Sequence, residues 1–529
     1  MLPKHHRLSI VYYLMGTKLP PRCLVVVAFL ALAACASQKP VPLPTIEKPT
    51  DKSEVAQMYA KVLDKVHKMY LDEYSVGKLA LSGLAGLSKL EPGATVQRKD
   101  DRVSLQINGT SVGMVAAAPI NDPYAWASAM KDLIDTGRNA STKLAEAKVE
   151  KIYQVTIDGI LADLDRYTRY DGKKAGQRNR ESREGFGGIG VSIINHAEGM
   201  LVDAVTSGLP ASKAGVIKGD IIIKVDDMLL HRFSLQRKLR LIRGPLGKPV
   251  RVTLKRASQP KPLNFLISRT RIIPTTVFYQ ARPHYAYLRI TSFYQDTTSE
   301  LRDNVEKAVR EFDGTLDGIV IDLRGNPGGL LDQAVSAADL FLQTGRISTT
   351  SGRHPDSLQL FDALEGEIAQ DIPIVLLMNG ASASASEVLA AALQDHGRAV
   401  LVGSNSFGKG TVQTVIRLPN EGELILTWAR LHSPLGFDLS QTGVIPTLCT
   451  SGAKDITAVL KRSLGNQKPP APAIVSKAIT NNARTTADQK CPWQPQEGVD
   501  VDIAVAKRIL EKIELYKHAL SQSVKTAGG

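Results

Sequence analysis

The sequence predicts a multidomain α/β protein with a helical N-terminal region, a small β domain, an α/β domain and a C-terminal helical tail. Its 529 residues suit three or four units at roughly 150 residues each. Apolar residues recur at helical spacing early in the chain, and from Tyr285 short apolar strands alternate with helical segments. A composition of 43% hydrophobic and 22% charged residues excludes a mostly disordered or multi-span membrane protein.

The first 34 residues have the pattern of an export signal. Residues 1–22 contain four Lys or Arg and no acidic residue, and the apolar run 23–34 is too short to span a membrane. Its end, Leu32-Ala33-Ala34-Cys35, resembles the bacterial lipobox, which implies that Cys35 becomes the lipidated first residue. Ordinary cleavage after a small residue is the alternative. We therefore expect the periplasmic side of a bacterial cell envelope, with a lipid anchor.

The N-terminal region is predicted to be helical. Residues 35–52 are rich in proline and predict a tether. Over 53–182 we expect a helical region, because apolar residues repeat at helical spacing over 55–90 and again over 124–165. Between these stretches, 103–118 alternate weakly and indicate a small hairpin.

Residues 183–271 predict a small β domain that opens with a glycine loop. Its spacing satisfies GxGxxG, but a β-branched strand rather than a helix follows, which excludes the dinucleotide-binding context. A glycine loop before a strand suits a backbone nest for a peptide carboxylate beside a sheet edge. The order of elements resembles a bacterial PDZ domain, and a β domain without a ligand is the alternative. The resemblance places the carboxylate loop at Gly187, Gly188, Ile189 and Gly190.

Residues 272–450 predict an α/β domain with a largely parallel sheet. Right-handed crossovers through helices make successive strands parallel. Beyond this domain, 451–529 predict a helix, a linker rich in Pro and Ala over about 467–497, and a final helix over about 499–520. In the α/β domain we expect strands at 285–290, 318–323, 373–378 and 399–402, and helices near 297–312, 330–342 and 384–395.

The sequence gives no sign of a metal or nucleic-acid site. The four cysteines lack the spacing of a zinc site, and no HExxH is present, so we expect no metal. The net charge is +14, but Lys and Arg are spread along the chain without a basic run. In an oxidising envelope Cys449 and Cys491 can form a disulfide across the C-terminal linker. Sequence separation does not fix their distance, so this pairing stays open.

Three predicted strands end in unusual loops, and the carboxyl ends of parallel strands share one edge of a sheet. The loops are 324–329 (Arg-Gly-Asn-Pro-Gly-Gly), 379–384 (Asn-Gly-Ala-Ser-Ala-Ser) and 403–411 (Gly-Ser-Asn-Ser-Phe-Gly-Lys-Gly-Thr). They bring glycine amides, Ser384 and Lys409 to that edge. Ser384 with a Glu three residues later also fits a helix capping box, and the lysine loop fits part of a phosphate-binding loop whose hydroxyl residue is missing.

A lysine accepts a serine proton only when its amine is neutral, so its pKa must be lowered. Apolar neighbours such as Phe407 and Val412 would lower the pKa of Lys409. Gln413 lies four residues beyond the lysine, so on a strand the two side chains share a face and the amide can orient the amine.

Four motifs resemble the carboxyl-terminal processing proteases, a tail-specific Ser-Lys family. The resemblance spans about 150–450, with the PDZ-like part included. In that family the nucleophile precedes the lysine by twenty-five residues, as Ser384 precedes Lys409. The motifs are 322–329 (Asp-Leu-Arg-Gly-Asn-Pro-Gly-Gly), 382–387 (Ser-Ala-Ser-Ala-Ser-Glu), 393–398 (Leu-Gln-Asp-His-Gly-Arg) and 407–413 (Phe-Gly-Lys-Gly-Thr-Val-Gln).

The resemblance implies a crotonase-like α/β serine protease domain in which Ser384 is the nucleophile, Lys409 the general base and Gln413 its orienting partner. A Ser-His-Asp triad is the rival, since Asp395 and His396 follow the serine, but His396 stands at a predicted helix end. The family pattern also implies an oxyanion hole at the amide of Ala385 and at one of two glycines, Gly328 or Gly329.

We therefore expect an exported serine endopeptidase that recognises protein C-terminal tails through the PDZ-like domain and cleaves through an acyl-enzyme. No metal or organic cofactor is expected. Expected partners are proteins with accessible C-terminal tails and, through the N-terminal lipid, the membrane; a homo-oligomer or an adaptor stays open. The alternatives are an inactive PDZ-containing adaptor that binds peptides, and acyl-CoA chemistry on a related fold. Arg243 is a hypothesis for coupling peptide binding to activation.

Overall fold

The computed structural model describes residues 53–440, 443–465, 491–494 and 500–528. The predicted signal sequence, the lipidation at Cys35 and the tether lie outside the described residues. So does most of the predicted linker over 467–497. Within the described part of the chain, no helix is both long and apolar enough to cross a membrane.

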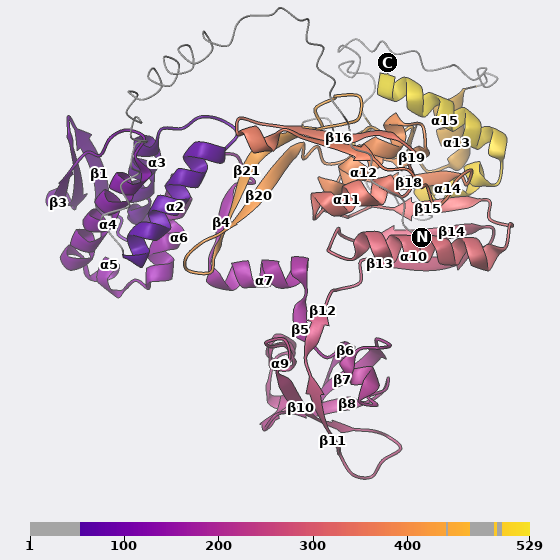
Figure 1. The fold of residues 1–529 in the computed structure, drawn as a ribbon, viewed down its shortest axis with the longest axis horizontal. Helices are drawn as coiled ribbons and strands as arrows, with labels where there is room; N and C mark the ends of the chain where they lie inside the picture. Colours follow the sequence, from indigo (N-terminus) through magenta and orange to yellow (C-terminus); the bar gives the residue numbers. More distant parts are fainter. Residues whose placement is uncertain (1–52, 441–442, 466–490, 495–499, 529) are drawn as a thin grey trace, which may run out of the picture. The chain divides into compact units, whose positions relative to one another are not determined.

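The N-terminal region is a group of helices with a small antiparallel sheet (Figure 1). Its core surrounds Trp126, which is fully buried with Tyr59 and Met58. The hairpin expected over 103–118 is confirmed, and a third strand extends it to a meander. The elements are α2 (Glu54–Met69), α3 (Val76–Ala85), β1 (Ala94–Lys99), β2 (Arg102–Ile107), β3 (Thr110–Ala116), α4 (Pro123–Ala140), α5 (Thr142–Glu146) and α6 (Val149–Ile160).

A charged stretch without apolar periodicity connects this region to a distant strand. β4 (Arg169–Asp171) pairs antiparallel with β21 (Glu423–His432), and α7 (Lys173–Glu184) follows β4. Glu423 is 1% exposed and accepts hydrogen bonds from Arg180 (3.1 Å) and Arg183 (2.6 Å) of α7. Apolar periodicity does not predict α7, because a buried ion pair rather than an apolar face attaches this helix to the protein.

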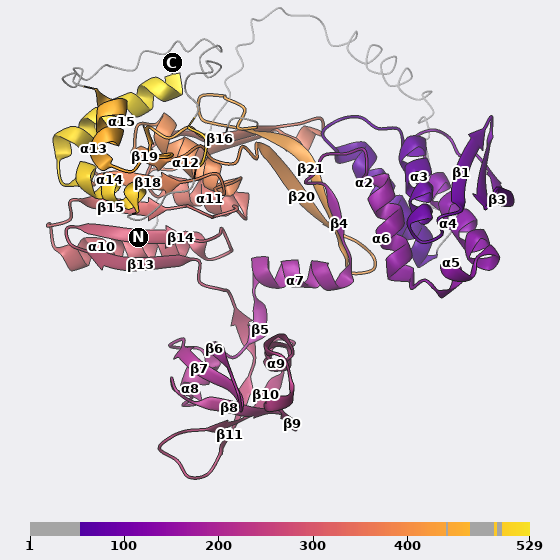
Figure 2. The same cartoon turned by 180° about the vertical axis from the view of Figure 1, so that it is seen from behind.

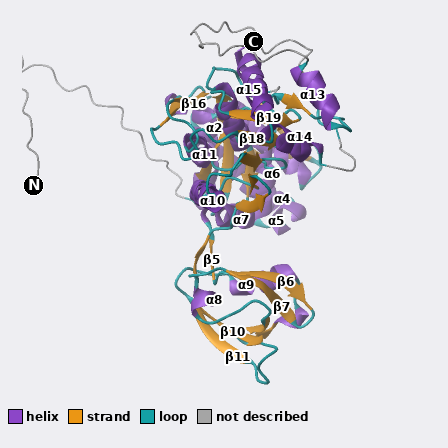
Figure 3. Cartoon of the chain, turned by 90° about the vertical axis from the view of Figure 1, so that its right-hand side faces the viewer, coloured by secondary structure: helices purple, strands orange, loops and turns teal. Residues whose placement is uncertain are grey.

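The β domain is a sheet of order β11-β10-β8-β7-β6 with two short helices (Figure 3). Within the described residues β6 is an edge strand, so one side of its backbone has no neighbouring strand. β5 and β12, at the two ends of the domain, pair with each other. The elements are β5 (Phe186–Gly188), β6 (Val191–His196), β7 (Gly199–Val205), α8 (Pro210–Lys213), β8 (Ile221–Val225), β9 (Met228–Leu229), α9 (Leu235–Ile242), β10 (Pro249–Lys255), β11 (Leu263–Ser268) and β12 (Thr270–Ile272).

The α/β domain is built on a sheet of order β13-β14-β15-β18-β19-β22 in which every pair after β13–β14 is parallel. The largely parallel sheet expected from the sequence is therefore confirmed. Its strands are β13 (Val277–Arg282), β14 (Tyr285–Ile290), β15 (Gly318–Asp322), β18 (Ile374–Met378), β19 (Ala399–Gly403) and β22 (Leu448–Cys449).

Helices cover both faces of this sheet (Figures 1 and 2). On β15, Ile319 and Ile321 join the apolar core on one face, and Val320 joins the core on the other. The first face packs against α10 (Thr297–Phe312), α11 (Leu331–Asp339) and α12 (Ala385–Asp395). The second packs against α13 (Ile456–Leu464), α14 (Val501–Leu510) and α15 (Ile513–Gly528). The single final helix expected over 499–520 is thus two helices, separated by a break at Glu511 and Lys512.

A second sheet has the order β17-β16-β21-β20, and β4 also pairs with β21. Its strands are β16 (Gly345–Ser351), β17 (Gln359–Ala363), β20 (Thr411–Arg417) and β21. The sequence indicates only that a strand follows Lys409, and that strand is β20. This sheet joins the loop that carries Lys409 to the N-terminal region, because β21 pairs with both β20 and β4.

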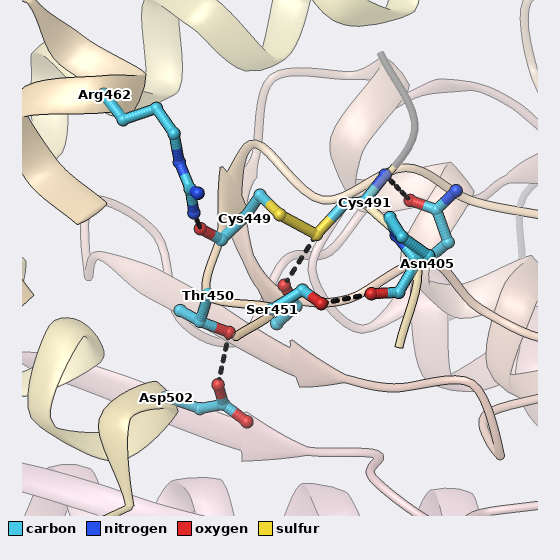
Figure 4. The surroundings of a disulfide bond; sticks show 9 residues. Asn405, Cys449, Thr450, Ser451, Arg462, Cys491 and Asp502 are labelled. Carbon is cyan, nitrogen blue, oxygen red and sulfur yellow. Dashed lines mark hydrogen bonds between the residues drawn. A yellow bond between two sulfur atoms is a disulfide. The ribbon is translucent and has the colours of Figure 1, made fainter. Parts of the chain in front are cut away.

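A disulfide joins Cys449, at the end of β22, to Cys491 (Figure 4). Their Cα atoms lie 5.8 Å apart. The pairing that the sequence left open is therefore formed. It attaches residues 491–494 to the carboxyl edge of the parallel sheet.

Replacing Glu423 with Gln should loosen the attachment of α7 to β21. The substitution leaves two arginines facing a neutral amide in a nearly closed site, at a cost of the order of 3 kcal/mol in the free energy of unfolding. Calorimetry should show a lower melting temperature. Glu421→Gln is the matched control, because the Glu421 carboxylate pairs with Arg417 at the exposed surface. Equal melting temperatures for the two variants would show that the buried ion pair contributes no more to stability than the exposed one.

Candidate active site

The three loops predicted from the sequence meet at the carboxyl edge of the parallel sheet. β15, β18 and β19 are parallel neighbours, so the loops that follow them lie side by side. The Ala383 amide donates to the Asn326 carbonyl oxygen (3.0 Å), and the Phe407 amide donates to the Ser382 carbonyl oxygen (2.9 Å). The serine loop 379–384 is therefore hydrogen-bonded to the glycine loop 324–329 and to the lysine loop 403–410.

Ser384 occupies the N-cap position of α12 with φ 57° and ψ −114°. Residues other than glycine rarely adopt this conformation, and such strain is common at functional sites. The Glu387 amide donates to the Ser384 carbonyl oxygen (2.8 Å), and the Ser384 amide donates to Glu387 Oε2 (2.6 Å). The predicted capping box is therefore present in the backbone of Ser384, which bonds with Glu387 at the start of α12. This leaves a chemical role for the Ser384 hydroxyl open.

The carboxylate of Glu387 ties the serine and lysine loops together. It is fully buried, and both of its oxygens accept two hydrogen bonds. Oε1 accepts from Ser406 Oγ (2.5 Å) and the Gly408 amide (2.7 Å), and Oε2 accepts from the amides of Ser384 (2.6 Å) and Lys409 (3.0 Å). Since 2.6 and 3.0 add to 5.6 Å, the amide nitrogens of Ser384 and Lys409 lie at most 5.6 Å apart. Burial raises the pKa of the Glu387 carboxyl, and the four donors favour its ionised form.

The side chain of Lys409 is largely removed from solvent, and this burial, with a contribution from the nearby Arg169, lowers its pKa. Its Nζ lies 5.1 Å from the centre of the Tyr167 ring. Within the described residues no hydrogen bond joins Lys409 Nζ to Ser384 Oγ. The expected apolar neighbour Phe407 is 45% exposed, and its ring faces the guanidinium of Arg166 at 5.3 Å.

The structure does not join Gln413 to Lys409. The Gln413 amide nitrogen donates to Thr411 Oγ1 (3.0 Å) and Thr427 Oγ1 (3.2 Å). Lys409 precedes β20, and a register shift falls between Val412 and Gln413, so the simple alternation of side chains along a strand does not apply.

The segment 165–168, which the sequence analysis did not select, reaches the lysine. Asp165 Oδ1 accepts from the Tyr167 amide (2.8 Å) and from Thr427 Oγ1 (3.0 Å), while Oδ2 accepts from Thr168 Oγ1 (2.7 Å). These bonds fix the segment to β21 and set the Tyr167 ring beside Lys409. No local pattern marks Tyr167, because its partner lies in another domain of the sequence.

The two glycines of the oxyanion-hole hypothesis have different surroundings. A Cβ added to Gly328 would lie 2.9 Å from Ser384 Cβ and 3.0 Å from the Ala385 nitrogen, so Gly328 packs directly against the serine. Its own amide donates to Asn326 Oδ1 (2.9 Å). Gly329 forms a parallel bridge with Phe293. In this bridge the Phe293 amide donates to the Gly328 carbonyl oxygen, and the Leu330 amide donates to the Phe293 carbonyl oxygen. The Gly329 amide therefore points the other way, and the described residues offer it no acceptor.

Asp395 and His396 are far from the serine. Ser384 and His396 cap opposite ends of α12, a helix of 11 residues whose length is roughly 16 Å. Asp395 Oδ2 accepts from Ser433 Oγ (2.6 Å), and His396 Nε2 lies 2.7 Å from the Arg346 carbonyl oxygen. This geometry excludes a Ser-His-Asp triad with Ser384.

The predicted carboxylate loop of the β domain spans the end of β5 and the two residues before β6. Gly187 and Gly188 belong to β5 and pair with β12, Ile189 is buried, and Gly190 has φ 85°. The loop thus leads directly into β6, the edge strand of the domain. Arg243 lies 3.8 Å from the centre of the Phe186 ring.

Two family models match the chain. One, described as Peptidase family S41, matches residues 284–449, and one described as PDZ domain matches residues 201–256. The first range contains all three loops of the candidate site, and the second lies within the β domain.

Curated relatives match more than half of the chain. A carboxy-terminal-processing protease of Bartonella bacilliformis is 38% identical over 301 residues, which cover 56% of this chain and 69% of the relative. A probable CtpA-like serine protease of Staphylococcus aureus is 34% identical over 302 residues, which cover 56% of this chain and 60% of the relative.

Solved structures give weaker matches. The photosystem II D1 C-terminal processing protease is 23% identical, with a TM-score of 0.38 over 75% of this chain and 92% of that one. The PDZ domain of a carboxy-terminal protease from Vibrio cholerae, in complex with a peptide, is 23% identical, with a TM-score of 0.15 over 16% of this chain and 96% of that one. The sequence relatives and the family models carry the assignment: this chain belongs to peptidase family S41, as a carboxy-terminal-processing serine peptidase with a PDZ domain.

Proposed function

We propose that the protein is an exported endopeptidase that cleaves substrates through Ser384 and Lys409. One observation carries this proposal: a single oxygen of Glu387 binds the amides of both residues. The lowered pKa of Lys409 supports it, because a neutral amine can take the serine proton.

The catalytic cycle begins with proton transfer from Ser384 Oγ to Lys409 Nζ. The lysine side chain has four methylene groups, so rotations within the side chain can bring its amine toward the serine. The serine oxygen then attacks the peptide carbonyl, the lysine returns the proton to the leaving amine, and an acyl-enzyme remains. Water, activated by the same amine, hydrolyses it.

The developing oxyanion would accept hydrogen bonds from the amides of Ala385 and Gly329. Ala385 is the first residue of α12, where the helix dipole also favours a negative charge. Gly329 is favoured over Gly328 because the Gly328 amide already donates to Asn326. Gly328 serves through its lack of a side chain, since a Cβ there would collide with the serine.

Substrate tails would bind in the PDZ domain as an added strand along β6, with the terminal carboxylate at the loop 187–190. The free edge of β6 supports this mode of binding. Export and lipidation at Cys35 rest on the pattern of residues 1–35. Protein substrates with accessible C-terminal tails follow from the PDZ match, and an inactive adaptor is disfavoured because both candidate catalytic residues are present.

Ser384→Ala and Lys409→Ala should each reduce peptide cleavage by roughly 10⁴-fold or more, because each removes a reacting group. Cleavage of a tail-bearing substrate is the measurement, with circular dichroism to confirm the fold. Lys307→Ala is the matched control, because Lys307 also lies over a tyrosine ring, that of Tyr279 (5.2 Å), but on α10. Substantial activity in the Lys409 variant would remove this lysine from the mechanism.

Arg169→Met should shift the pH dependence of cleavage. Activity should rise with pH as Lys409 loses its proton. Burial lowers the pKa of Lys409 and Arg169 adds to this effect, so removing the guanidinium raises that pKa and moves the acid limb of kcat/KM to higher pH. Glu387 and Asp165, the acidic groups facing the amine, are unchanged in this variant. An unmoved acid limb, or the same movement in the exposed Arg302→Met control, would contradict the assignment of the limb to Lys409.

Tyr167→Leu should slow catalysis, because the ring no longer holds the ammonium that forms when the serine loses its proton. A cation-π contact of about 0.5–2 kcal/mol corresponds to a loss of roughly 2- to 30-fold in kcat. Tyr167→Phe keeps the ring and should retain most of the activity, whereas Tyr279→Leu removes a similar contact elsewhere and should have no effect. The measurement is kcat from steady-state kinetics. A fully active Tyr167→Leu variant would show that the ring does not stabilise the ammonium of Lys409.

A further inference from the structure

Four residues near the C-terminus, Cys491–Gln494, contact both catalytic loops; we call them the clamp segment. The Asn405 amide in the lysine loop donates to the Cys491 carbonyl oxygen (2.8 Å), and the Cys491 amide donates to Asn405 Oδ1 (3.2 Å) (Figure 4). Trp493 touches the serine loop, because a Cβ added to Gly380 would lie 3.2 Å from Trp493 Cβ. One short segment therefore contacts the loops of both Ser384 and Lys409.

The disulfide is the strongest link between the clamp segment and the domain. Besides the contacts with Asn405 and Gly380, the segment's links are few: Ser451 Oγ donates to the Pro492 carbonyl oxygen, and Gln494 packs against Gly452. The Trp493 side chain stays 58% exposed. A cavity of about 150 Å³ adjoins the segment and is lined by Arg324, Asn379, Ser404, Thr450, Ser451, Asp502, Trp493 and Gln494. The hydrophobic core clusters of the described residues include no residue of the segment, so its attachment rests on the disulfide and on these few contacts.

The clamp segment adds support to the lysine loop, whose backbone also donates from Ser404, Ser406 and Phe407 to the carbonyl oxygens of Met378, Val444 and Ser382. It contains Gly403, Gly408 and Gly410, and glycine permits many backbone conformations in a loop that must hold one. Glu387 fixes the far part of the loop, and Asn405 is the contact of its near part with the clamp segment. Catalytic groups displaced by about 1 Å can lose roughly 100-fold in rate.

We propose that Cys449 and Cys491 are positioning residues for the catalytic loops, and that reduction of their disulfide switches proteolysis off. This inference rests on the proposed Ser384–Lys409 mechanism. Reduction by a dithiol breaks the sulfur–sulfur bond: two electrons and two protons convert the cysteines to thiols, and the reductant becomes its own disulfide. Cys491 is 2% exposed and Cys449 is half-buried, so Cys449 is the more exposed of the two cysteines.

The test compares the full chain with Cys449→Ser/Cys491→Ser, at a temperature well below the melting transition of both. We expect kcat to fall about tenfold or more in the variant while KM for a tail-bearing substrate changes little, because tails bind in the PDZ domain. Labelling of Ser384 by a fluorophosphonate probe should slow in parallel. A lower melting temperature with unchanged kcat and labelling rate would show a merely structural disulfide and overturn the proposal.

Reduction of the folded wild type by dithiothreitol should reproduce the loss, and reoxidation should restore the activity. The double variant is the control, since any effect of the reductant that persists in it comes from the other cysteines. If the double variant does not fold, Asn405→Ala replaces it in the test, because this substitution removes one contact with the clamp segment and keeps the disulfide. The proposal is refuted if Asn405→Ala has the wild-type kcat and dithiothreitol does not change the activity of the wild type. Wild-type protein that the probe does not label would instead contradict the Ser384 mechanism itself.

Discussion

The active site depends on one buried carboxylate. The Glu387 carboxylate accepts hydrogen bonds from the backbone amides of Ser384, Gly408 and Lys409 and from the hydroxyl of Ser406. It therefore holds the start of α12 and the lysine loop at the same point. All four partners donate hydrogen bonds. A protonated Glu387, or a glutamine in its place, would carry a donor of its own and leave one of these partners without an acceptor. The cost of burying this charge is offset by charge-assisted hydrogen bonds, and the result is a fixed distance between two backbones.

Those parts of the fold and site that rest on local patterns could be predicted from the sequence. The strands of the parallel sheet are continuous apolar runs, and α10 has its expected bounds of 297–312, because both follow from periodicity within a few residues. The serine and lysine loops were found because glycine and serine clusters follow those strands. α7 was missed because ion pairs hold it. The strands β16, β17 and β21 were also missed, although β21 carries the apolar run 424–426, because their sheet is assembled from strands that are distant in the chain.

The contacts that surround the candidate catalytic side chains could not be predicted, because they join segments that are far apart in the chain. Tyr167 meets Lys409 where segment 165–171 pairs with and bonds to β21, and Asn405 meets Cys491 in a segment that a disulfide joins to β22. Gln413 shows a limit of local reasoning: a bulge between Val412 and Gln413 interrupts the strand alternation on which its predicted role was based. Motifs therefore identify reacting groups, while their orientation depends on tertiary pairing.

In the proposed mechanism, the position of Lys409 reflects a balance between two needs of a base. Burial lowers its pKa and supplies the neutral amine that accepts a proton, but the same burial disfavours the ammonium formed once the proton arrives. An aromatic face is suited to this conflict, because it attracts the cation and has little interaction with the neutral amine. A carboxylate in direct contact with Nζ would stabilise the ammonium in the resting enzyme and remove the base. The Tyr167 ring therefore offers support to the charged state without strong cost to the neutral one.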